Sequence, residues 1–267
     1  MFVLPWYVAY AQTSRIEIQQ NKCFSAANYL AYQVPSQDSY SPAPQGYQPF
    51  YISTYARHGS RFHLSEYDYV HVLTILQKAD SAGVLSTTGK KTMEKINRIR
   101  QLANGRLGEL TPLGAQQHRG IAERMYHNFP EIFSGNTVID ARSTNVVRCI
   151  LSMTAECLQL QALNPQLRIY NDASLHDMYY MNYHDKYLAS LHADSKAELL
   201  KAFKQQHIHP ERLMKVLFTD TVYIQNTIHP SHFMEELFYI TINMQSHDEK
   251  ELDLYHSVSY THLTLPT

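Results

Sequence analysis

Residues 50–61 read FYISTYARHGSR, an apolar run that ends in a histidine between two arginines. The apolar and β-branched residues from Phe50 to Tyr55 predict a strand, and the segment from Glu66 to Ala79 predicts a helix. The motif at residues 57–61 therefore lies at a strand end, where α/β folds place their ligands. This stretch predicts an α/β fold with a site at the end of a strand.

The arginines on either side of His58 form a group suited to a phosphoryl ligand. The guanidinium groups of Arg57 and Arg61 can hold non-bridging oxygens through forked, charge-assisted hydrogen bonds. Their charge opposes protonation of His58, whose neutral ring can attack phosphorus and form a covalent intermediate. Gly59 lets the backbone approach a substrate or adopt positive φ. In a chain with 15 histidines, the alternative for this pair is an ordinary surface or core position.

A second anion-binding position is predicted next to residues 137–141, TVIDA, a run typical of a short buried strand. Arg142 follows this strand and precedes Val146 to Gln161, whose apolar residues predict a helix that Ser143 or Thr144 caps. A strand end beside a helix N-terminus favours an anion. The alternative is an arginine in a salt bridge or in solvent.

The motif at residues 57–61 resembles the signature Arg-His-Gly-x-Arg of the histidine acid phosphatases, the second branch of the histidine phosphatase superfamily. Arg61 favours this branch over the phosphoglycerate-mutase-like branch, which usually has Glu or Gln next to Arg-His-Gly. The resemblance implies that His58 is the nucleophile and that Arg57 and Arg61 bind phosphate.

Two further segments resemble the same family, and together the matches cover about residues 45 to 160. Residues 142–152 resemble the segment whose first arginine is the third phosphate ligand, which implies that role for Arg142, while Arg148 is assigned to structure. Residues 108–118 resemble the family's Leu-Thr-x-x-Gly entry to a helix, with Thr111 as N-cap and a helix from Pro112 to about Asn128. His118 in this helix is expected on the surface or in the core rather than at a ligand.

Within the family, residues 44–51 and 243–247 look most like the multiple inositol polyphosphate phosphatase and phytase group. The resemblance implies a phosphomonoester hydrolase that forms a phosphohistidine, acts on inositol polyphosphates such as phytate and needs no cofactor. The alternatives are an inactive binder of phosphate esters, an acid phosphatase of broad specificity, and a mutase or phosphotransferase of the other branch.

The family fold implies a three-layer α/β/α core of the phosphoglycerate-mutase type with an inserted helical cap. We place the N-terminal part of this core at residues 12–172 and the cap at residues 173–257, where strand signals nearly disappear. The core would be incomplete at its C-terminal end. Helices are predicted at residues 87–103, ended by Asn104-Gly105, and at 195–205, 210–218 and 230–244.

The family also needs a carboxylic acid that protonates the leaving alcohol, in a late His-Asp or His-Ala-Glu motif. The chain has His-Asp pairs at 176–177, 184–185 and 247–248, but all lie in the predicted cap, so no proton donor is assigned. Residues 258–267, VSYTHLTLPT, resemble a back-translated sequencing adapter, and we interpret them as a non-native tail. We therefore expect the chain alone to be unstable and nearly inactive.

Composition limits the partners of the chain. A formal net charge of −1 gives no global field for nucleic acid or membrane binding. The resemblance implies that the partner is a small phosphate ester. Residues 1–11 end in Ala-Tyr-Ala and resemble a remnant signal peptide, although a buried N-terminal strand is the alternative. No other apolar stretch approaches the length needed to span a bilayer. We expect an exported protein, periplasmic or secreted.

The chain has three cysteines, Cys23, Cys149 and Cys157. Cys149 and Cys157 lie on one predicted helix, about 12 Å apart along its axis, which is too far for a disulfide. Cys23 could pair with either of them. No metal-ligand spacing stands out, and the predicted chemistry requires no metal.

Overall fold

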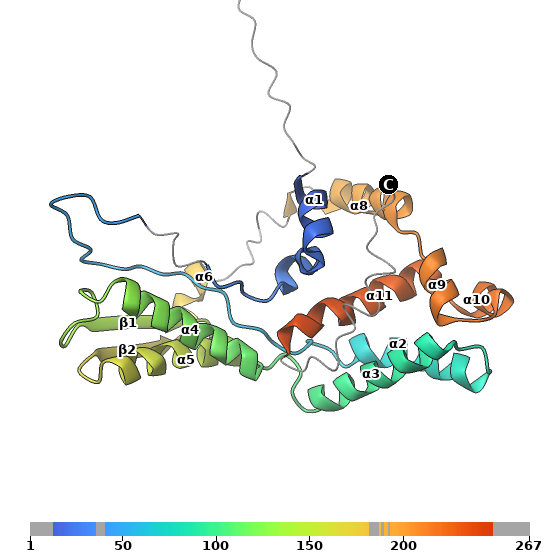
Figure 1. The fold of residues 1–267 in the computed structure, drawn as a ribbon, viewed down its shortest axis with the longest axis horizontal. Helices are drawn as coiled ribbons and strands as arrows, with labels where there is room; N and C mark the ends of the chain where they lie inside the picture. Colours follow the sequence, from blue (N-terminus) through green and yellow to red (C-terminus); the bar gives the residue numbers. More distant parts are fainter. Residues whose placement is uncertain (1–12, 36–40, 182–186, 188–189, 192, 248–267) are drawn as a thin grey trace, which may run out of the picture.

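The computed structural model describes residues 13–35, 41–181, 187, 190–191 and 193–247 (Figure 1). It combines many helices with one small parallel sheet of β1 (Val138–Ser143) and β2 (Arg168–Ala173). This composition agrees with the broad α/β class that the sequence predicts.

The sheet belongs to a β-α-β unit. Val138 pairs with Arg168 at one end of the ladder and Ser143 with Ala173 at the other, and α5 (Val147–Leu163) connects the two strands. Helix α4 (Pro112–Asn128) packs against α5, and the two lie together at the sheet in Figure 1. A small apolar cluster of Ala122, Phe133, Leu160 and Leu167 joins these elements.

The start of α5 differs from the prediction. Its N-cap residue is Val146, which makes no side-chain cap hydrogen bond. Ser143 is the last residue of β1, and its hydroxyl donates to the carbonyl of Thr144 at 2.8 Å. The predicted cap at Ser143 or Thr144 is therefore wrong, because β1 extends through Ser143 and the helix begins only after Val146.

A larger apolar core holds the helices on the other side of the molecule in Figure 1. These helices are α2 (Tyr67–Ser81), α3 (Thr87–Ala103), α9 (Glu211–Leu217), α10 (Thr221–Thr227) and α11 (Pro230–Asn243). On α2 the buried residues recur at the spacing of one helix face: Tyr69, Val72, Leu73, Leu76 and Ala79. Helices on both sides of the predicted boundary at residue 172 share this core, and the boundary itself stays a prediction.

Shorter elements complete the described fold. The N-terminal segment forms α1 (Thr13–Gln20) and the 3₁₀ helix η1 (Lys22–Tyr29). The 3₁₀ helix η3 (Leu175–Asp177) and α6 (Met178–Met181) follow β2, and α8 (Ala193–His207) precedes α9. The 3₁₀ helix η4 (Met244–Ser246) extends α11.

The strand predicted for Phe50 to Tyr55 is not formed within the described residues. This segment is extended, and Phe50, Tyr51 and Tyr55 are exposed at 92%, 72% and 78%. An apolar run becomes a strand only where another strand pairs with it, and the motif makes a single bridge, between Arg61 and Leu110. The described sheet has two strands, so the three-layer core stays a prediction.

Several sequence predictions fall outside the described residues. These are residues 1–11, the tail 258–267, the pair His184-Asp185 and Asp248. Among the residues that are described, no helix combines the length and apolarity required to cross a membrane. Cys149 and Cys157 are free cysteines, so neither forms a disulfide with Cys23.

Candidate active site

The motif 57–61 is a loop seated on the first turn of α4. Thr111 caps this helix, because its hydroxyl oxygen accepts the N–H of Gly114 at 3.1 Å. The same residue binds the loop, since its backbone N–H donates to the carbonyl of Ser60 at 2.9 Å. The contact is very close: a Cβ atom on Gly59 would lie 2.3 Å from the carbonyl oxygen of Gly114. Position 59 therefore requires glycine, because any side chain there would collide with the backbone of α4.

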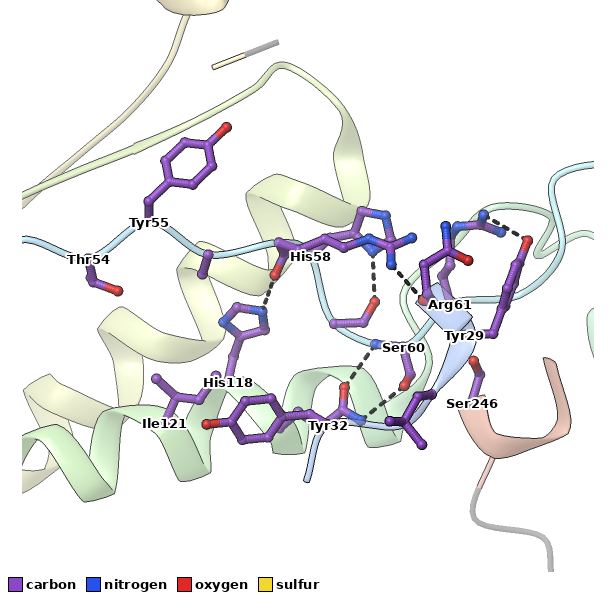
Figure 2. A pocket seen from close by; sticks show the side chains of 16 residues that line it. Tyr29, Tyr32, Thr54, Tyr55, His58, Ser60, Arg61, His118, Ile121 and Ser246 are labelled. Atoms are coloured by element: carbon purple, nitrogen blue, oxygen red, sulfur yellow. Dashed lines mark hydrogen bonds between the residues drawn. The ribbon is translucent and has the colours of Figure 1, made fainter. Parts of the chain in front are cut away.

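Side chains of α4 and α5 hold the loop in place through hydrogen bonds. The N–H of Gly59 donates to the hydroxyl of Ser152 at 3.1 Å. Gln117 accepts the N–H of Ser60 at 2.9 Å and donates to its hydroxyl at 3.0 Å. Figure 2 shows the two hydrogen bonds between Gln117 and Ser60 as dashed lines. The backbone N–H groups of Gly59 and Ser60 are thus both held by helix side chains.

His118 has a larger part in the site than the sequence indicated. It is buried, as expected, but its Nε2 lies 3.1 Å from the carbonyl oxygen of Arg57 and its Nδ1 lies 2.9 Å from Glu156. Figure 2 shows the ring reaching from α4 toward the backbone at the motif. The pair His118 and Glu156 therefore positions the backbone of the residue before the candidate nucleophile.

One pocket of about 440 Å³ brings much of the predicted site together. Residues 54–61 line it, so Arg57, His58 and Arg61 all contribute (Figure 2). The segment around η1 supplies Asn28, Tyr29 and Tyr32, α4 supplies Gln117, His118 and Ile121, and η4 supplies Ser246. No local sequence signal marks the residues in and after η1, since they reach the pocket only through tertiary packing.

His58 is held in the tautomer that suits nucleophilic attack. Its Nδ1 lies 2.8 Å from the carbonyl oxygen of Gly59, and a carbonyl oxygen only accepts, so Nδ1 carries the hydrogen. The lone pair is then on Nε2. The pKa of His58 is lowered to about 4, mainly by burial and also by the charges of Arg148, Arg57 and Arg61, while the hydrogen bond to Gly59 opposes the shift. The ring is therefore neutral over most of the acid range.

The motif arginines lower the pKa of His58, as the sequence predicted, but desolvation by burial is the larger cause. Arg148 also acts on His58 electrostatically, in addition to its expected structural hydrogen bond to the carbonyl of Gly108 at 3.5 Å.

The two motif arginines are anchored by different neighbours. Arg57 donates from Nη1 to the carbonyl of Asn28 at 2.6 Å. Arg61 donates from Nη1 to the carbonyl of Phe62 at 2.8 Å and from Nη2 to the hydroxyl of Tyr29 at 3.3 Å. An arginine has five N–H donors, so these anchors leave donors on both guanidinium groups for an anion.

Arg142 is not among the residues that line this pocket. Its guanidinium donates to Asp140 at 3.1 and 3.3 Å and to Asp177 at 3.3 Å. The hydrogen bond to Asp140 is the main reason that its pKa is raised. The structure therefore brings Arg57, His58 and Arg61 together and places Arg142 in an ion-pair group beside them. Its role as third phosphate ligand stays a prediction.

No described residue supplies an evident proton donor. Among the described residues that line the pocket, none is Asp or Glu. Asp177 is buried against Arg142, and the ring of His247 lies 4.9 Å from that of Phe62. Asp185 and Asp248 lie outside the described part of the chain.

Half of the chain is similar to solved structures of a phosphatase. These are structures of the multiple inositol polyphosphate phosphatase of Bifidobacterium longum. Its complex with inositol hexasulfate matches at a TM-score of 0.43 with 30% identity, over 51% of this chain and 29% of that one. Its complex with phosphate gives a TM-score of 0.44 with 30% identity and the same coverage, 51% and 29%. The apo form gives 0.43 with 31% identity, over 50% and 28%.

The chain thus spans less than a third of the length of these phosphatase structures. No protein-family model matches the chain. A search of curated proteins likewise finds no match.

Proposed function

We propose that this protein is a phosphomonoester hydrolase that works through a phosphohistidine at His58. The observation that carries the proposal is the neutral imidazole of His58 in a pocket that Arg57 and Arg61 also line. The hydrogen bond from Nδ1 to Gly59 leaves Nε2 as the nucleophile. Few reactions other than phosphoryl transfer use a neutral imidazole between two fixed positive charges.

The reaction has two steps. Nε2 of His58 attacks phosphorus, a P–N bond forms, and the bond from phosphorus to the leaving oxygen breaks. The leaving alcohol takes up a proton from an acid that is not assigned here. Water then attacks phosphorus, a P–O bond forms and the P–N bond breaks, so that inorganic phosphate leaves with the protons of the water and the lone pair returns to Nε2 of the neutral ring. Arg57 and Arg61 neutralise charge on the equatorial oxygens in both steps, which is the main catalytic need of phosphoryl transfer.

Inositol polyphosphates are the substrate class that the sequence segments favour. Because the net charge of the chain is −1, a polyanion can be attracted only by local positive charges. The guanidinium groups of Arg57 and Arg61 in the pocket supply these charges. Arg142 belongs to the proposal as a further phosphate ligand, which requires that it leave Asp140 or Asp177. Export is proposed on the Ala-Tyr-Ala sequence at residues 9–11.

A comparison of two phosphate esters tests nucleophilic attack separately from proton donation. Because 4-nitrophenolate is a weakly basic leaving group, it departs without an acid, whereas an inositol alkoxide does not. We expect the chain to release a burst of 4-nitrophenolate from 4-nitrophenyl phosphate and to hydrolyse inositol hexakisphosphate slowly. His58→Ala abolishes the burst. The exposed His127 on α4 gives the matched control His127→Ala, which keeps it.

The main alternative is a protein that binds phosphate esters without cleaving them. It predicts saturable binding of inositol hexakisphosphate that is lost in Arg57→Ala and Arg61→Ala, with no burst from 4-nitrophenyl phosphate. A burst of equal size in the native chain and in His58→Ala contradicts the phosphohistidine proposal.

A further inference from the structure

A second cluster of chemically active side chains lies where α2 packs against α11. Within the described residues, His71 of α2 and His232 and Glu236 of α11 place one ligand atom each within 4.8 Å of one another. Glu236 already contacts both imidazoles. Its two oxygens lie 2.7 Å from Nδ1 of His71 and 3.2 Å from Nε2 of His232. Three groups from two helices thus converge on one point.

The donor set and its spacing suit a transition-metal ion. Two imidazole nitrogens and one carboxylate form a ligand set that zinc uses in catalytic sites, with bonds of about 2.0 to 2.2 Å. His232 and Glu236 are four residues apart on one helix face, the spacing that places two side chains side by side. The ion would replace the proton that His71 shares with Glu236, and Nε2 of His232 already lies 3.2 Å from the other carboxylate oxygen.

The surroundings leave room for a fourth ligand. His71 and His232 line a pocket of about 190 Å³ together with Lys78, Tyr223 and His229. Two of the three ligands, His71 and His232, line this pocket, so an ion held by the three groups has a coordination position on the pocket side for water. Lys78 adds a positive charge to this pocket on a long flexible stem, which can turn toward solvent.

We propose that His71, His232 and Glu236 form a binding site for a divalent transition metal such as Zn²⁺ that links α2 to α11. The link has a consequence for the pocket at His58. Buried Asn243 at the end of α11 donates to the carbonyl of Arg61 at 3.0 Å. An ion at the start of α11 therefore stabilises the helix that holds a motif arginine. The proposal that a metal binds at this site does not rest on the proposed phosphatase chemistry.

This site was not predicted from the sequence. No metal-ligand spacing stands out there, although His232 and Glu236 have the i, i+4 spacing on a predicted helix. The third ligand, His71, lies 161 residues before His232 and joins the set only through packing of α2 against α11.

Cobalt substitution tests the site directly. Titration of the full chain with Co²⁺ should give visible absorption bands of a four- or five-coordinate ion at one equivalent, and Zn²⁺ should displace them. His232→Asn alters a side chain that is 59% exposed and so should fold normally. It should weaken binding more than about 100-fold, since even residues behind metal ligands are worth 10- to 100-fold. Glu236→Gln should act in the same direction.

The matched control is His229→Asn, which lines the same pocket but is not in the ligand set. It should bind Co²⁺ as the native chain does. Zn²⁺ at about 100 times its dissociation constant should raise the Tm of the native chain by several degrees and leave that of His232→Asn unchanged. No Co²⁺ bands, equal binding by His232→Asn, or loss of binding in His229→Asn would overturn the proposal.

Discussion

The contact between Gly59 and Gly114 holds the motif on α4, and replacement of Gly114 by alanine tests it. Gly114 is buried in the first turn of the helix. A Cβ atom at this position would lie 2.3 Å from the carbonyl oxygen of Ser60 and 2.8 Å from its nitrogen. Both atoms belong to the backbone, so no side chain can turn aside to admit the methyl group.

The geometry sets the size of the effect. Ordinary contact begins at 3.4 Å, so the loop and the helix must separate by about 1.1 Å. Overpacking of this kind costs about 1 to 3 kcal/mol. Alanine in a helix offsets at most about 1 kcal/mol of this through its better helix propensity. We expect Gly114→Ala to lower the free energy of unfolding by about 1 to 2 kcal/mol.

The displacement should also affect chemistry. A catalytic group misplaced by about 1 Å can lose about 100-fold in rate. We therefore expect the initial 4-nitrophenolate burst of folded Gly114→Ala to be slower by about that factor. Urea unfolding gives the stability, and stopped-flow absorbance gives the burst rate.

Gly120 supplies the control on the same helix. A Cβ atom there meets only the end of the flexible Arg124 side chain, at 3.3 Å. Gly120→Ala should be neutral or stabilising by up to about 1 kcal/mol, with an unchanged burst. If Gly114→Ala is as stable and as fast as Gly120→Ala, then the loop does not rest on α4 as described.

Three further predictions follow from hydrogen bonds and pKa values. Because the pKa of His58 is about 4, the burst rate should stay constant from pH 7 to about pH 5 and fall below that; half-loss near pH 6.5 in stopped flow would contradict this. Ser152→Ala leaves the N–H of Gly59 without its partner, so urea unfolding should show a loss of about 1 to 3 kcal/mol, and no loss would refute the role of this contact. Burial lowers the pKa of His63 to about 3. The unfolded chain therefore binds more protons between pH 6.5 and pH 3, and stability falls as pH falls through this window. His63→Phe should lose less stability than the native chain between pH 7 and pH 4, and an equal loss would refute this.

Local signals explain why parts of the fold could be predicted. Thr111 and Pro112 form a helix start that depends on a few adjacent residues, and α4 begins and ends where the sequence predicted. The same holds for α3, which spans the predicted residues 87–103. Caps, proline and periodic apolar residues act over one or two turns, so their effect can be read without knowledge of distant partners.

The remaining features depend on contacts between distant residues. The apolar run before the motif has the composition of a strand, but a strand also needs a hydrogen-bonded neighbour, which composition does not reveal. Arg142 pairs with Asp140, two positions earlier, and also with Asp177, 35 positions later, and only the second contact depends on tertiary packing. His118 could be expected in the core, yet its contact with the carbonyl of Arg57 comes from packing of α4 under the loop.

The central claim is that Nε2 of His58 becomes phosphorylated. The most direct test is to quench the native chain during the burst with labelled 4-nitrophenyl phosphate and to map the label by mass spectrometry. We predict an acid-labile, alkali-stable phosphoryl group on the peptide that contains His58, absent from His58→Ala and present in His127→Ala. A phosphoryl group on another residue, or none during a burst that His58 still supports, would contradict the account.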